Sequence, residues 1–245
     1  VGRCLFVNRL RCRVGMCVNH THKERNHLMN EKKPRHSSTA AVPMYEMTVT
    51  LPDLPVWRKL LVRGDMNLGL LHAVLQVAMG WTNSHLHQFF IGTEIYTAFM
   101  PDLDPDFGES MLDEEEALLM DVVKSANTTF VYLYDFGDSW EHEIKVDKIH
   151  KSDTAPLAVA ECLDGAGACP PEDCGGIGGY VDLLEIIKDP THEEHEAMME
   201  WLGGEFDPEA FGIKKVNNYL KKLKFPRVTE LQLAKLLMAR DGYHA

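Results

Sequence analysis

Hydrophobic and polar residues alternate in several short stretches of the first 150 residues, and a period of two is typical of half-buried β-strands. Strands are predicted on this basis at 45–51, 56–62, 85–91, 94–99, 129–134 and 140–146. Between the second and third stretches the period changes to that of a helix. Asn67 can cap this helix, which runs to Met79, and Gly80 can end it.

The last third of the chain has helical spacing throughout. Helices are predicted over 181–188, after a capping box of Thr191 and Glu194, after Asp207-Pro208, and after a capping box of Thr229 and Gln232. Strands therefore come first and helices follow. This order predicts an α+β fold with a helical C-terminal part, and it argues against a parallel βαβ sheet.

Charge divides the chain into two parts. Residues 1–43 hold nine Lys/Arg and two Asp/Glu, so 16 basic and 35 acidic residues remain over 44–245. We expect 1–43 to be a disordered basic tail or upstream sequence, and 44–245 to be one domain. Because the acidic part repels phosphate backbones, nucleic-acid binding by it is disfavoured.

The chain has no obvious membrane or export signal. No apolar run approaches the roughly 18 residues of a membrane span, and Arg residues interrupt the N-terminal stretch VGRCLFVNRLRCRVGMCV. We therefore expect a cytoplasmic protein that does not associate with membranes. In that reducing compartment the six cysteines are thiols or metal ligands rather than disulfides.

The stretch YDFGDSWEHEI contains the DFG triplet of protein kinases. The chain lacks the Gly-rich loop, the strand lysine and the HRD-type loop that a kinase also needs. The triplet instead lies between two predicted strands, so it forms the tip of a β-hairpin, where Gly137 is expected to take a positive φ. The period of two places Trp140, His142 and Ile144 on the core face.

Histidines occupy several predicted inward positions. His72 lies on the apolar side of its helix, His85 and His87 share one strand face, and His142 follows the hairpin tip with Asp135 and Asp138. Such groups could form a metal or acid–base site. In the alternative, each is a core histidine with a hydrogen-bond partner of its own.

Three cysteines follow the hairpin with the spacing C-x6-C-x4-C around a Pro-Pro pair and several glycines. Cys162, Cys169 and Cys174 need one more ligand for a tetrahedral zinc site, and His142 is the nearest candidate. In the alternative they are small buried side chains, as free cysteines commonly are.

Six ordered motifs of the chain resemble the Ri-plasmid ORF-3-like family: PVWRKLLV, LHAVLQVAMGW, SHLHQF, YDFGDSWEHEI, CPPEDCGGIGGY and FDPEAFGIKKVN. The resemblance spans roughly residues 44–223 and implies an α+β domain with a curved antiparallel or mixed sheet and packed helices. Some members carry a transposon-resolvase label. A serine-recombinase motif is absent here, so a resolvase role is not expected.

Two functions are compatible with these features. In the first, the chain is a binding or adaptor module whose pocket is formed by the sheet, the DFGDSWEH hairpin and the CPPEDCGG loop, and it takes a peptide, a protein or a small ligand. In the second, it is a metal-dependent or acid–base hydrolase that uses the inward His and Asp residues. Convergence of those side chains beside a cavity would favour the second function, and scattered, separately bonded histidines would oppose it.

Overall fold

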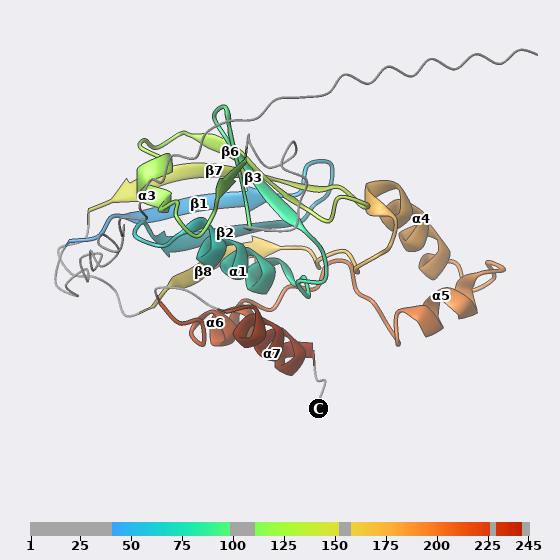
Figure 1. The fold of residues 1–245 in the computed structure, drawn as a ribbon. Coiled ribbons are helices and arrows are strands. Elements are labelled where there is room, and N and C mark those ends of the chain that lie inside the picture. The colour runs from blue at the N-terminus through green and yellow to red at the C-terminus, as the bar shows by residue number, and fades with distance from the viewer. Residues whose placement is uncertain (1–40, 99–110, 152–157, 226–228, 242–245) are drawn as a thin grey trace, which may run out of the picture. The chain divides into compact units, whose positions relative to one another are not determined.

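The computed structural model describes residues 41–98, 111–151, 158–225 and 229–241 (Figure 1). From residue 41 onward these residues belong to one compact unit. The basic segment predicted to be a tail lies almost wholly outside the described residues. Within the described part, no helix is both long and apolar enough to cross a membrane.

An eight-stranded sheet runs through this unit in the order β5-β4-β3-β6-β7-β1-β2-β8. Neighbouring strands are antiparallel except β4 and β5, which are parallel, so the sheet is mixed. The strands are β1 (Met44–Thr50), β2 (Trp57–Arg63), β3 (His87–Ile91), β4 (Glu94–Thr97), β5 (Met111–Asp113), β6 (Thr129–Tyr134), β7 (Trp140–His150) and β8 (Ala160–Ala166).

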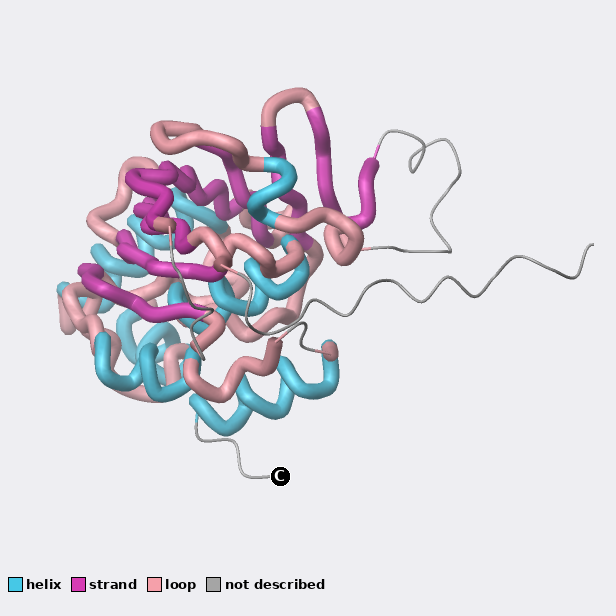
Figure 2. The backbone as a smooth tube through the Cα atoms, turned by 90° about the vertical axis from the view of Figure 1, so that its left-hand side faces the viewer, coloured by secondary structure: helices cyan, strands magenta, loops and turns pink. Residues whose placement is uncertain are grey.

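Six helices occur in the described residues: α1 (Leu68–Met79), α3 (Leu119–Val122), α4 (Gly176–Lys188), α5 (His195–Trp201), α6 (Ile213–Leu220) and α7 (Glu230–Asp241). With the mixed sheet they confirm the predicted α+β class. Figure 1 shows α1, α6 and α7 on one side of the sheet, and Figure 2 again places helices beneath the strands.

Local signals at the helix ends account for most of the boundaries. The predicted cap of α1 is confirmed, since the Leu70 N–H donates to Asn67 Oδ1 at 2.9 Å. The capping box before α7 is also confirmed by two reciprocal bonds between Thr229 and Gln232. The capping box predicted at Thr191 is wrong. The N–H and the hydroxyl of Thr191 both donate to Asp189 Oδ1, and α5 begins only after Glu194.

Helix α1 is buried along its whole length except Gly69, because the sheet covers one side of it and other helices cover the other side. Arg240 of α7 donates to the backbone oxygens of Gln76, Gly80 and Trp81, and so fixes α7 at the C-terminal end of α1. The core face of β7 is confirmed: Trp140, His142, Ile144 and Val146 are all 0% exposed.

Candidate functional site: His85 and three carboxylates

The hairpin between β6 and β7 fixes the carboxylate of Asp135. Asp135 Oδ1 accepts the N–H groups of Gly137 at 2.8 Å and Asp138 at 3.3 Å. The positive φ predicted for Gly137 is wrong, because the tip places Asp135 (φ 59°) and Ser139 (φ 55°) in the left-handed region instead. Aspartate tolerates this region better than most residues do. The turn therefore orients Asp135 and leaves its second oxygen, Oδ2, available.

The CPPEDCGG loop, between β8 and α4, fixes a second carboxylate in the same manner. Glu172 Oε1 accepts three hydrogen bonds: from the Thr82 N–H at 2.6 Å, from the Thr82 hydroxyl at 2.7 Å and from the Tyr134 hydroxyl at 3.0 Å. Burial raises the pKa of Tyr134, so the phenol stays protonated and donates. The other oxygen of Glu172, Oε2, is buried without a hydrogen-bond partner.

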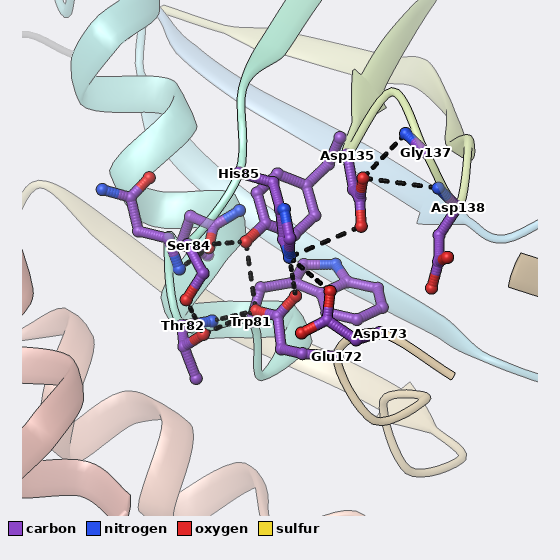
Figure 3. A network of polar contacts seen from close by, with 12 residues as sticks. Trp81, Thr82, Ser84, His85, Asp135, Gly137, Asp138, Glu172 and Asp173 are labelled. Atoms are coloured by element: carbon purple, nitrogen blue, oxygen red, sulfur yellow. Dashed lines mark hydrogen bonds and ion pairs between the residues drawn. The ribbon is translucent and has the colours of Figure 1, made fainter. Parts of the chain in front are cut away.

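The free carboxylate oxygens converge on one ring nitrogen. His85 Nε2 lies 3.0 Å from Asp173 Oδ1, 3.5 Å from Asp135 Oδ2 and 3.8 Å from Glu172 Oε2 (Figure 3). His85 precedes β3, and its ring packs edge-on against Tyr134. In the described part of the chain, His85, Asp135 and Asp173 form the one group of three His, Cys, Asp or Glu donors within 4.8 Å of one another.

Two buried polar atoms of this cluster have no hydrogen-bond partner within the chain. Like Glu172 Oε2, the buried His85 Nε2 has no partner in hydrogen-bond geometry, although Asp173 lies within ion-pair distance. A single proton on Nε2 can point to only one of the three oxygens. Buried polar atoms without partners are rare in native proteins, and a bound ion is one accepted explanation of them. The donor set therefore fits a cation placed between the hairpin and the loop.

The other predicted histidines have separate partners. His87 Nε2 is 2.8 Å from Glu114 Oε2, and the His87 ring stacks on His72 with centroids 3.5 Å apart. His142 Nε2 accepts the Trp81 indole N–H at 3.1 Å. Burial lowers the pKa of His72 and His87 to about 3 and that of His142 to about 4, so all three are neutral at pH 7. All three histidines are buried in the core.

Of the predicted catalytic candidates, the structure brings together only His85 and Asp135. His87 and His142 are held elsewhere by the contacts above. Asp138 Oδ2 instead accepts the Gly175 N–H at 3.1 Å, at the start of α4. Asp138 thus attaches the loop to the hairpin without facing His85.

The structure does not bring the predicted zinc ligands together. No three of Cys162, Cys169, Cys174 and His142 place donor atoms within 4.8 Å of one another. Cys162 lies in β8, a strand that was not predicted, and its thiol is 3.3 Å from the Asp164 backbone oxygen. Burial raises the pKa of Cys162 to about 11 and that of Cys174 to about 12, which keeps these thiols protonated. Zinc binding by the cysteines stays a prediction that the metal content of Cys169→Ser would test.

A pocket of about 470 Å³ adjoins the cluster and shares His85 with it. Its lining is formed by the segment before β3 and the end of β4: Asn83, Ser84, His85, Leu86, His87, Thr97 and Ala98. The volume is in the range of small-molecule sites.

Glu172 and Asp173 were missed by the sequence analysis, which considered only the cysteines of this loop. One signal was available: two adjacent acidic residues between a Pro-Pro pair and Cys-Gly-Gly, in a loop that follows the hairpin. The backbone conformation that directs these side chains toward His85 cannot be predicted from the composition of the loop. Asp173 has a φ of 58°, a left-handed conformation that turns its side chain toward His85.

Comparison with known proteins places the whole of this site within a recognised family. The profile of the plasmid pRiA4b ORF-3-like proteins matches residues 43–215. The chain belongs to the plasmid pRiA4b ORF-3-like family. The resemblance noted in the sequence is thereby confirmed, and the matched span contains His85, Asp135, Glu172 and Asp173.

Two proteins that are similar to this chain illustrate the family. The protein of Sinorhizobium fredii strain NBRC 101917 / NGR234 described as uncharacterized protein y4hQ is 36% identical over 189 residues, which are 75% of this chain and 93% of that protein. The crystal structure of MM3350 from Methanosarcina mazei Go1, described as a protein of unknown function, is 31% identical with a TM-score of 0.63. That match covers 71% of this chain and 97% of MM3350. Neither description assigns an activity.

Proposed function

We propose that the protein is a metal-ion-binding module in which His85, Asp135 and Asp173 hold one divalent cation, with the Glu172 carboxylate beside them. The observation that carries the proposal is that these three residues bring donor atoms within 4.8 Å of one another. The hydrogen bonding of Asp135 and Glu172 supports it. Each carboxylate has one oxygen fixed by two or three hydrogen bonds, and the other oxygen points to His85 Nε2. Hydrogen bonds of this kind orient ligands in known metal sites.

The spacing of the donor atoms supports a metal ion. Ligand atoms about 2.1 Å from a metal are about 3.0 Å apart at adjacent octahedral positions and about 3.4 Å apart in a tetrahedron. The distances from His85 Nε2 to the Asp173 and Asp135 oxygens are 3.0 and 3.5 Å, close to these values. Glu172 Oε2 lies farther away, at 3.8 Å.

The charge and the chemistry of the donors indicate which cations to test. As ligands, one imidazole and two carboxylates carry a charge of −2, which a divalent ion offsets, and the Glu172 carboxylate adds negative charge nearby. Imidazole favours zinc and iron, whereas carboxylates also suit manganese and magnesium. We therefore expect Zn²⁺ or Mn²⁺ to bind in preference to Ca²⁺, which takes six to eight oxygen ligands.

The His85 cluster combines the hairpin and the CPPEDCGG loop named in the binding-module hypothesis, whereas the neighbouring pocket is lined by residues 83–87, 97 and 98 and by neither of those segments. Asp135 comes from the hairpin, Glu172 and Asp173 come from the loop, and His85 borders the neighbouring pocket. His87 and His142 are each held by partners other than His85, which opposes the hydrolase that was to use His85, His87 and His142 together.

Isothermal titration of the chelator-treated full chain with Zn²⁺ and Mn²⁺ tests the proposal. We expect one equivalent to bind, and we expect Asp173→Asn and Asp135→Asn to weaken binding at least tenfold because each removes a charged ligand. Glu141→Gln is the matched control, since Glu141 is an exposed carboxylate on β7 that points away from the site. Absence of binding, or equal binding by all three variants, would contradict the proposal.

A further inference from the structure

Helix α5 packs only loosely against the rest of its chain. None of the seven residues of α5 is buried, and no side chain caps its N-terminus. Isolated helices shorter than about 12 residues are marginal in water, and most helices are stabilised by packing of one face. Only three of the 13 residues of α4, the helix that α5 contacts, are buried. We call residues 176–201 the α4–α5 arm.

The α4–α5 arm exposes large apolar side chains. Ile177 and Val181 are 40% and 44% exposed, and they lie one turn apart on the same face of α4. Trp201, at the end of α5, is 49% exposed. Met198 and Met199 beside it are half-buried, and methionine is enriched at binding surfaces because its side chain adapts to different partners. The arm therefore offers apolar area that a partner can cover.

The same arm is strongly acidic. It carries one lysine and seven acidic residues, all exposed: Asp182, Glu185, Asp189, Glu193, Glu194, Glu196 and Glu200. Exposed carboxylates around apolar side chains repel phosphate backbones and anionic lipid surfaces. They attract a segment that is basic on one face and apolar on the other.

We infer that the α4–α5 arm is a docking surface for a basic amphipathic helix of a partner protein. Apolar side chains of the partner would cover Ile177, Val181 and Trp201, while its lysines or arginines would pair with the surrounding carboxylates. Recognition of an amphipathic helix by apolar and acidic side chains is an established mode of peptide binding. This inference does not depend on the proposed metal site.

A synthetic amphipathic helix of leucine and lysine tests the inference on the full chain. Trp201 reports binding, because it is half-exposed whereas Trp81 and Trp140 are fully buried, and because the fourth tryptophan, the partly buried Trp57, lies in β2 outside the arm. We expect its emission to shift to the blue on addition of the peptide and expect Trp201→Phe to remove most of that shift. A shuffled peptide of the same composition, which has no apolar face, should bind at least tenfold more weakly.

Charge reversal at matched positions tests whether the peptide binds to the α4–α5 arm or is attracted only by the net negative charge of the protein. Glu196→Lys with Glu200→Lys changes two exposed positions of α5, and Glu141→Lys with Glu143→Lys makes the same change in net charge on the exposed face of β7. The first pair should weaken binding about tenfold and the second pair far less. Equal losses for the two pairs, or equal binding of the shuffled peptide, would overturn the inference.

Discussion

Single residues at the His85 site derive their orientation from hydrogen bonds that do not involve the proposed cation. Asp135 is held by two backbone N–H groups, and Glu172 is held by Thr82 and Tyr134. Ligands fixed in advance lose little conformational freedom on binding. The supporting groups should therefore affect metal affinity even though they do not touch the metal.

Gly137 offers a direct test of that support. A Cβ atom at this position would lie 3.2 Å from Asp135 Oδ1, closer than an ordinary contact, so the carboxylate must move by a few tenths of an ångström. We expect Gly137→Ala to weaken Zn²⁺ binding about tenfold, at the lower end of effects seen for groups that orient metal ligands. Gly178→Ala is the control, because a Cβ there meets nothing within 4 Å. Unchanged affinity in Gly137→Ala would show that Asp135 is not a ligand.

The buried histidines predict how stability depends on pH. Burial holds the pKa of His72 and His87 at about 3 and that of His142 at about 4, whereas the unfolded chain keeps values near 6.5. Between these limits the unfolded chain binds more protons. Stability is thus fully present above about pH 6.5 and falls as the pH decreases toward 3, by up to about 1.4 kcal/mol per pH unit for each histidine.

Urea unfolding between pH 7 and pH 5 measures this dependence. The free energy of unfolding should fall steeply over the range. His142→Gln should reduce the slope by roughly a third, since it removes one of three contributing groups. A slope unaffected by His142→Gln would mean that this histidine is not buried neutral in the folded protein.

At the scale of elements, the β6–β7 hairpin is the structural centre of the site. Its strands bury Trp140 completely, against Trp81, with ring centroids 5.3 Å apart. Trp140→Ala should lower the free energy of unfolding by about 3–5 kcal/mol, because it leaves a large cavity in the core. A loss below about 1 kcal/mol by urea unfolding would show that the assigned face of β7 is wrong.

The elements that sequence predicts well are those with strong local signals. The six predicted strands occur close to the expected positions, because each has alternating apolar and polar residues. Helix α1 does so as well, because Asn67 and Gly80 mark its two ends. Strand β8 was not predicted, since ECLDGA contains glycine and acidic residues and pairs only at the edge of the sheet. Strand β5 is only three residues long. Both are specified by partners distant in sequence.

The candidate site was predictable only in part for the same reason. Alternation identified His85 and Asp135 as chemically interesting but gave His85, His87 and His142 equal weight. Glu172 and Asp173 contact His85 in the folded chain although roughly 87 residues separate them from it in the sequence. Such convergence depends on tertiary packing, which a single sequence does not display.

At the scale of the whole molecule, the acidic charge predicts the response to nucleic acid. A chain beginning at residue 44 carries 16 basic and 35 acidic residues, so it cannot gain much by releasing counterions from DNA. We expect no duplex binding at physiological salt in a fluorescence-anisotropy titration. Submicromolar affinity that weakens steeply with added salt would refute this expectation and would revive the resolvase hypothesis.

The central claim is that one cation joins the hairpin to the CPPEDCGG loop at His85. Anomalous diffraction from crystals of the full chain grown with Zn²⁺ or Mn²⁺ tests it most directly. The account predicts one strong peak about 2.1 Å from His85 Nε2, Asp135 Oδ2 and Asp173 Oδ1. No peak at this position, or a metal bound instead by Cys162, Cys169 and Cys174, would contradict it.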